Sequence, residues 1–157
     1  MAQDDPQGTD DDSRTDEQWR AVLSDQEYRI LRRSGTETAG TGRYLDHESA
    51  GAYHCAGCGQ KLYGGEHKFH SGCGWPSFNQ EIEPDALTYI TDTTHGMDRT
   101  EMRCSRCGGH LGHVFNDAPD QPTGLRHCVN GYALIFVPQG ADPQAVIRQH
   151  REENANR

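Results

Sequence analysis

Apolar residues recur at helical spacing in two short segments near the start of the chain. The first predicted helix face holds Trp19, Val22 and Leu23, and the second holds Tyr28 and Leu31. A capping box precedes each segment, at 15–18 and at 24–27, where Thr or Ser is followed three residues later by Gln or Glu. The pattern predicts two short helices, the second ending near Gly35.

After Gly40 the pattern changes to short β-type runs separated by Gly, Asn, Asp and Pro. The runs are 52–55, 87–91, 101–104, 113–115 and 133–137, with Pro138 ending the last one. Such a series predicts a mainly β fold of antiparallel strands, with the short helices at its N-terminal edge.

Both ends of the chain are more polar. Asp occupies positions 4, 5, 10, 11, 12 and 16, with almost no apolar residue among them. We therefore expect a disordered acidic tail over 1–16, a folded domain over 17–140 and a C-terminal tail over 141–157. Asp142-Pro143 is able to cap a short helix through Val146 and Ile147, and 151–157 are expected to fray.

Composition narrows the classes of function. The chain has 157 residues, 32% of them hydrophobic, and 18 glycines. This composition is typical of one loop-rich domain whose apolar core needs additional stabilisation. No apolar run approaches the roughly 20 residues of a membrane span, and the acidic N-terminus is unlike a signal peptide. We expect a cytoplasmic protein with reduced thiols and no membrane partner. The net charge of −9 argues against a nucleic-acid partner.

Two C-x-x-C-G motifs supply Cys55 with Cys58 and Cys104 with Cys107. Two intervening residues let both sulfurs of a motif reach one ion, and the following glycine tolerates a positive φ. Four thiolates with no open position predict one structural Zn²⁺ per chain. Redox C-x-x-C pairs and an iron site are the less favoured alternatives. Nearby histidines then become surface or packing residues: His54, His67 and His70.

Cys73 and Cys128 remain outside these motifs. A lone cysteine is by default an inert small hydrophobe. Cys128 departs from that default because Arg126 and His127 beside it are cationic or able to become so, and cations lower a thiol pKa. The segment His110-Leu-Gly-His113 supplies two imidazoles. These features favour a thiol-based enzyme with Cys128 as a candidate nucleophile.

Several further segments follow one order along 17–138. They are Gly72-Cys73-Gly74-Trp75-Pro76-Ser77-Phe78, His95-Gly96-Met97, Arg103-Cys104-x-x-Cys107, His110-Leu-Gly-His113-Val-Phe115, Pro122-Thr-Gly124 and Arg126-x-Cys128-Val-Asn130. In this order they resemble the B-type methionine sulfoxide reductases, specifically the zinc-containing members. The resemblance implies two antiparallel β-sheets with peripheral helices and reduction of methionine-R-sulfoxide, free or in oxidised proteins, as repair of oxidative damage.

The resemblance also implies residue roles. Cys128 would attack the sulfoxide sulfur and become a sulfenic acid. His113, helped by His110 and Asn130, would protonate or hydrogen-bond the departing oxygen. Cys73 would resolve the sulfenic acid as a disulfide, which thioredoxin would reduce. These roles agree with the chemistry of sulfoxides, whose oxygen needs a proton donor to leave, and with the condensation of sulfenic acids with thiols.

Substrate contacts follow from the same resemblance. Trp75 would receive the ε-methyl group with Phe115 nearby, and Arg126 would favour the thiolate. An aromatic wall suits a methylthio group, although a core role for Trp75 stays open on the sequence alone. The sequence departs from the family at Gly131, where Ser is usual, and at Tyr132, where a small residue is common. His127 occupies a position that is often aromatic.

Three other functions compete with this hypothesis. One is a binding module with an aromatic cage around Trp75, the second is a nucleic-acid zinc ribbon, and the third is a general thiol peroxidase. A cage requires neither Cys128 nor His113, the charge disfavours the ribbon, and a peroxidase needs no methyl-binding tryptophan. We expect the protein to act as a monomer.

Overall fold

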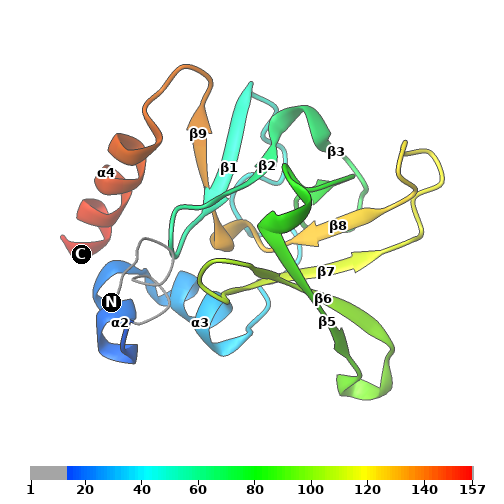
Figure 1. Cartoon of the computed structure of the whole chain (residues 1–157), viewed down its shortest axis with the longest axis horizontal. Coiled ribbons are helices and arrows are strands. Elements are labelled where there is room, and N and C mark those ends of the chain that lie inside the picture. Colours follow the sequence, from blue (N-terminus) through cyan, green and yellow to red (C-terminus); the bar gives the residue numbers. More distant parts are fainter. Residues whose placement is uncertain (1–13, 157) are drawn as a thin grey trace.

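The computed structural model describes residues 14–156 (Figure 1), so positions 1–13 of the predicted acidic tail lie outside the described residues. Helices α2 (Asp16–Val22) and α3 (Asp25–Arg33) begin at the two predicted capping boxes, and both boxes are formed. Asp16, assigned to the tail from the sequence, opens α2 and accepts hydrogen bonds from Tyr28 and Arg20. The second helix ends before Gly35, because Ser34 takes the left-handed conformation with φ 57°.

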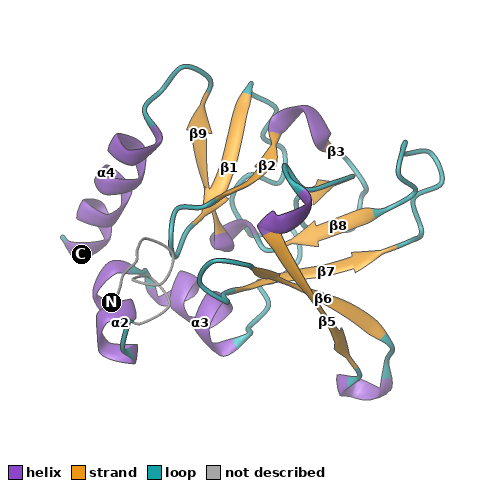
Figure 2. Ribbon diagram, viewed as in Figure 1, coloured by secondary structure: helices purple, strands orange, loops and turns teal. Residues whose placement is uncertain are grey.

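The strands form two antiparallel sheets, as the sequence predicts (Figure 2). The three-stranded sheet has the order β2 (Lys61–Gly64), β1 (Gly51–Cys55), β9 (Leu134–Pro138). The six-stranded sheet has the order β3 (Lys68–Phe69), β4 (Ser77–Phe78), β8 (Arg126–Val129), β7 (His110–Phe115), β6 (Arg99–Cys104), β5 (Leu87–Asp92). Short 3-10 turns lie between strands: η1 (Gly65–His67), η2 (Pro84–Ala86), η3 (Thr94–Gly96) and η4 (Gly131–Ala133).

Every run that the sequence analysis assigned to a strand forms one, although Ala133 belongs to η4 and Pro138 is the last residue of β9. Four strands were not predicted: β2, β3, β4 and β8. The most consequential of the strands that were not predicted is β8, because it carries Cys128. This strand belongs to the six-stranded sheet, and η4 separates it from β9 in the other sheet.

Buried aromatic rings join the two sheets. Tyr63 of β2 stacks on Phe78 of β4 with ring centroids 4.2 Å apart, and Tyr53 of β1 meets the edge of Phe78 at 5.2 Å. All three side chains are fully buried. Each such burial is worth about 1.5–3 kcal/mol, so this cluster holds the sheets face to face.

A third helix, α4 (Pro143–Ala155), packs beside β9 and α2 (Figure 1). Asp142 caps it as predicted, but positions 151–155, expected to fray, are helical. Arg151 donates a hydrogen bond to the Gly57 carbonyl, and the Asn154 side chain donates to the Val22 carbonyl at 3.0 Å. These contacts hold the last turns of the helix on the domain. No helix within 14–156 is long and apolar enough to cross a membrane.

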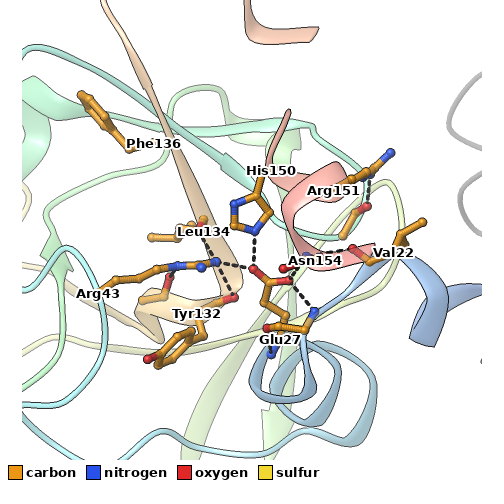
Figure 3. A network of polar contacts seen from close by, with 12 residues as sticks. Val22, Glu27, Arg43, Tyr132, Leu134, Phe136, His150, Arg151 and Asn154 are labelled. Atoms are coloured by element: carbon orange, nitrogen blue, oxygen red, sulfur yellow. Dashed lines mark hydrogen bonds and ion pairs between the residues drawn. The ribbon is translucent and has the colours of Figure 1, made fainter. Parts of the chain in front are cut away.

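Glu27 connects this helix to the rest of the fold (Figure 3). Its fully buried carboxylate accepts from Arg43 at 2.5 Å, from His150 at 2.6 Å and from Asn154 at 3.0 Å. Burial opposes the charge, but the hydrogen bond from His150, the charge of Arg43 and the Ser24 backbone outweigh it and lower the pKa of Glu27 from 4.5 to about 2. The ionised carboxylate therefore stabilises the fold near neutral pH.

We predict that Glu27→Gln lowers stability at neutral pH by about 3 kcal/mol, or the Tm by roughly 10 °C, because the partly buried Arg43 guanidinium loses its counter-charge. A carboxyl with a lowered pKa stabilises fully above its unfolded pKa and loses that contribution as pH falls through its folded pKa. The Tm difference between wild type and variant should therefore shrink from about pH 5 to about pH 2. Glu153→Gln, on the exposed surface of α4, is the control and should change little. A Tm difference that does not vary with pH would contradict the assignment.

Candidate functional site

The four cysteines of the two C-x-x-C-G motifs come together at one point. Cys55 ends β1 and Cys104 ends β6, so the cluster joins the two sheets. Its sulfurs lie within 4.8 Å of one another, with 3.7 Å between Cys55 and Cys107 and 3.5 Å between Cys58 and Cys104. The glycine that closes each motif has positive φ, 86° and 75°, as predicted.

These sulfurs fit a single metal ion. A tetrahedral ion with bonds of about 2.3 Å to sulfur separates its ligands by about 3.8 Å, close to the observed distances. All four side chains are buried, and contact with neighbouring sulfurs together with burial raises the pKa of Cys58 and of Cys104. Four thiolates in such a place need a cation between them. His54 is not one of the clustered ligands, and its Nδ1 is 2.8 Å from the Gly59 carbonyl.

The remaining cysteines, Cys73 and Cys128, lie with their sulfurs 3.6 Å apart. Cys128 sits in the middle of the six-stranded sheet, paired with Ser77 of β4 on one side and His113 of β7 on the other. Cys73 lies in the loop before β4, between Gly72 and Gly74 with φ 79° and 96°. The left-handed glycines turn this loop so that Cys73 faces the strand that carries Cys128.

The two thiols titrate as a pair. The hydrogen bond with Cys128 is the main cause that lowers the pKa of Cys73 to about 4, and the hydroxyls of Ser71 and Ser77 lower it further. The contact with Cys73, followed by burial, raises the pKa of Cys128, although Arg126 opposes this. The contact between the sulfurs therefore moves the two pKa values in opposite directions.

His127 is not the cation beside Cys128 that the sequence analysis expected. Adjacent strand residues point to opposite faces, so His127 is directed away from Cys128. Its Nδ1 is 3.0 Å from the Tyr63 hydroxyl, and burial lowers the pKa of His127 to about 4. The ring is neutral at neutral pH. It fills an aromatic position in the core, edge-on to Tyr63.

The two histidines of β7 each contact a carboxylate that the sequence analysis did not single out. His113 Nε2 is 2.7 Å from Asp92 Oδ2, and His110 Nδ1 is 2.6 Å from Glu101 Oε2. The two rings are 5.6 Å apart and edge-on. Glu101 comes from the neighbouring strand β6 and Asp92 from β5, one strand further on, so only the strand register brings them to the histidines.

Glu37, in the loop after α3, holds the side chains of Trp75 and Asn130 through its backbone. Its carbonyl accepts from Trp75 Nε1 at 3.0 Å, and its backbone N–H donates to Asn130 Oδ1 at 3.0 Å. Asn130 Nδ2 donates in turn to the Leu111 carbonyl at 3.0 Å. The Asn130 amide is thus committed to backbone groups on both sides, which suits a part in shaping the cavity.

Arg126 lies across the Phe115 ring, with its guanidinium 4.4 Å from the ring centroid. Asp117 holds it with two hydrogen bonds, of 3.0 and 2.9 Å. The guanidinium is therefore charged and fixed in orientation. Its charge lowers the pKa of Cys128, as predicted, but less than the contact with Cys73 raises it.

One cavity of about 250 Å³ contains every predicted catalytic and substrate-binding side chain. These are Cys73, Trp75, His110, His113, Phe115, Arg126, Cys128 and Asn130. The sequence analysis did not name Thr36, Arg99 and Gly112, which also line it. Three other hollows have larger volumes. Those of about 780 and 880 Å³ are lined by none of the predicted catalytic or substrate-binding residues, and the third, of about 320 Å³, shares Cys73 and Arg126 with the cavity. The cavity combines a thiol pair, two imidazoles and an aromatic wall, which suits thiol-based redox chemistry on a small group.

Comparison with known proteins places this cavity in context. The family model of the SelR domain matches residues 23–138. A Thiobacillus denitrificans protein named peptide methionine sulfoxide reductase MsrB is 56% identical over 129 residues, which is 82% of this chain and 97% of that protein. A protein of the same name from Agrobacterium fabrum is 49% identical over 126 residues, 80% of this chain and 93% of that protein. The probable methionine-R-sulfoxide reductase B of Caenorhabditis elegans is 48% identical over 120 residues, 76% and 79% of the two chains.

We predict that Cys104→Ser loses bound metal and lowers the Tm by roughly 10 °C or more, because metal binding by the buried cluster contributes directly to folding. Metal analysis of the wild-type protein should give about one ion per chain. Cys73→Ser removes a thiol outside the cluster and is the control, which should keep both the metal and the Tm. A Cys104→Ser protein with the Tm of the wild type would show that the four-cysteine cluster does not stabilise the fold.

Proposed function

The chain belongs to the B-type methionine sulfoxide reductases, a family of oxidoreductases, and from this premise we propose how its own residues reduce methionine-R-sulfoxide to methionine. The observation that carries the proposal is the distance of 3.6 Å between Cys73 and Cys128 inside a cavity that also holds Trp75 and His113. Sulfoxide reduction needs these parts together: an attacking thiolate, a proton donor for the oxygen, and a second thiol.

Cys128 is the attacking residue in this proposal. It sits on a strand directly opposite His113, whereas Cys73 lies on a loop. As substrate enters, it separates the two sulfurs, the proton of Cys128 passes to solvent, and Arg126, whose charge lowers the pKa of this thiol, stabilises the thiolate. The Cys128 thiolate then attacks the sulfoxide sulfur.

Oxygen transfer follows. The oxygen leaves the substrate sulfur, receives a proton from His113, and ends on Cys128 as a sulfenic acid. The substrate sulfur is reduced by two electrons to the thioether of methionine, and the Cys128 sulfur is oxidised by two electrons. His110 and Asn130 support this step from the cavity wall, and Arg126 favours the Cys128 thiolate once the substrate separates it from Cys73.

Trp75 and Phe115 recognise the methylthio group of the substrate. The indole is fixed by its hydrogen bond to the Glu37 carbonyl, so its face stays directed into the cavity. Contacts between sulfur and an aromatic ring are favourable, and an apolar subsite for the methyl group separates it from the oxygen beside His113. Two distinct subsites on one sulfur centre select one epimer.

Recycling completes the cycle. The Cys73 thiol attacks the Cys128 sulfenic acid, which forms a disulfide and releases the oxygen as water. Thioredoxin then reduces this disulfide by dithiol exchange and becomes oxidised itself. We also propose that Zn²⁺ fills the four-cysteine cluster, where it supplies rigidity and no chemistry, since four sulfurs leave no open position. A reducing cytoplasm would keep the four cluster cysteines free of disulfides and would return Cys73 and Cys128 to thiols after each cycle.

We predict that the enzyme, supplied with dithiothreitol, reduces the R epimer of methionine sulfoxide in a peptide and leaves the S epimer essentially untouched. The reason is the fixed separation of the Trp75 subsite from His113. Methionine formation from each pure epimer, measured by chromatography, tests this. Equal rates on the two epimers, or no reduction of either, would overturn the proposed function.

A further inference from the structure

We propose that Asp92 is the positioning residue of His113: it binds the imidazole through Nε2, leaves Nδ1 as the nitrogen that serves the substrate, and favours the protonated ring. This inference rests on the proposed function, in which His113 gives a proton to the leaving oxygen. Asp92 is 21 residues away from His113 in the sequence and belongs to another strand.

The geometry singles out one nitrogen of His113. The Nε2 atom is 2.7 Å from Asp92 Oδ2, and both side chains are mostly buried, with 14% and 15% of their surface exposed. His113 Nδ1 has no hydrogen-bond partner within 14–156, and the ring lines the cavity. Because a carboxylate accepts only, the proton on Nε2 belongs to this bond in every state of the ring. A proton given to substrate must come from Nδ1.

Asp92 is itself held in place. Its Oδ1 accepts from the backbone N–H of Thr94 at 3.0 Å and from the Thr94 hydroxyl at 2.7 Å, and Arg99 donates to Oδ2 at 3.4 Å. The bonds from Thr94 and then from His113 hold the pKa of Asp92 below its usual range. The carboxylate therefore remains ionised and in one orientation at every pH where the enzyme works.

The charged and titratable groups around His113 come from four strands and one loop. They are Asp92 of β5, Arg99 and Glu101 of β6, His110 of β7, Cys128 and Arg126 of β8, and Cys73. Within this set only Asp92 is hydrogen-bonded to the His113 ring. A hydrogen-bonded carboxylate stabilises imidazolium relative to imidazole, so within this set Asp92 is the group placed to support proton donation by His113.

His110 also has a carboxylate partner, but the pKa of His110 is lowered. Glu101 is shared with Arg103, which donates to it at 2.9 and 3.2 Å. The His110 ring is buried, and burial lowers its pKa despite Glu101. His110 is therefore neutral near neutral pH and suits a packing and hydrogen-bonding role. Of the two pairs, His113 with Asp92 is therefore the one that donates a proton, and His110 with Glu101 supports the cavity wall.

The first test needs no variant. Two-bond ¹H–¹⁵N spectra of the wild-type holoprotein, without substrate, report which nitrogen of His113 carries hydrogen. We expect Nε2 to stay protonated at all pH values and Nδ1 to lose its proton as pH rises. A neutral ring protonated on Nδ1 instead would overturn the proposal.

The second test uses Asp92→Asn. We expect the NMR titration midpoint of His113 to fall by about one pH unit, because the amide gives less support to imidazolium. With a peptide substrate, kcat/KM should fall about 10- to 100-fold, and the alkaline limb of its pH profile should move to lower pH by the same amount as the midpoint. Asp92→Glu keeps the charge and should restore much of the activity.

Asp98→Asn is the matched control, an exposed aspartate in the same hairpin between β5 and β6, and should change neither readout. An unchanged His113 midpoint in Asp92→Asn, or a loss of activity with an unmoved pH profile, would reduce Asp92 to a structural residue. The failure of the proposed function looks different. In that case the midpoint still moves, but the wild-type protein reduces no sulfoxide.

Discussion

The placement of β8 between β4 and β7 is the constraint on which the proposed chemistry depends. This pairing sets Cys128 opposite His113 on one side and next to Ser77, and through it the Cys73 loop, on the other. It requires a very close approach at Gly112, where a Cβ would lie 2.0 Å from the carbonyl oxygen of Cys128. Any side chain there would push β8 away from β7 and separate the thiol from its proton donor.

The rest of the fold holds this arrangement still. The four-cysteine cluster ties the end of β1 to the end of β6, and the stacked rings of Tyr63 and Phe78 press the two sheets together. The Glu27 network anchors α4 to α3 (Figure 3). Rigid support matters because oxygen transfer and disulfide formation both depend on sulfur positions set within a few tenths of an ångström. One loop residue, Cys73, then supplies the motion that recycling needs.

Local signals in the sequence were sufficient to predict the helix starts and the four-cysteine cluster. The capping boxes at Thr15 and Ser24 bond within four residues, and the C-x-x-C-G motifs fix their own turns, so both could be predicted without tertiary contacts. The family resemblance supplied the eight residues that the cavity brings together. The partners of His113 and His110 could not be predicted, because Asp92 and Glu101 reach them only through the register of three strands. His127 was misjudged for a related reason: without a strand assigned to 126–129, its direction away from Cys128 was hidden.

The central claim is that oxygen removed from methionine sulfoxide leaves a disulfide between Cys73 and Cys128 and nowhere else. The most direct measurement treats the wild-type protein with one equivalent of methionine-R-sulfoxide without reductant, blocks the remaining thiols under denaturing conditions, and maps the peptides by mass spectrometry. The account predicts one linked peptide that joins Cys73 to Cys128, with the four cluster cysteines recovered as blocked thiols. Methionine formed while Cys73 is recovered as a blocked thiol, or a disulfide that includes a cluster cysteine, would contradict it.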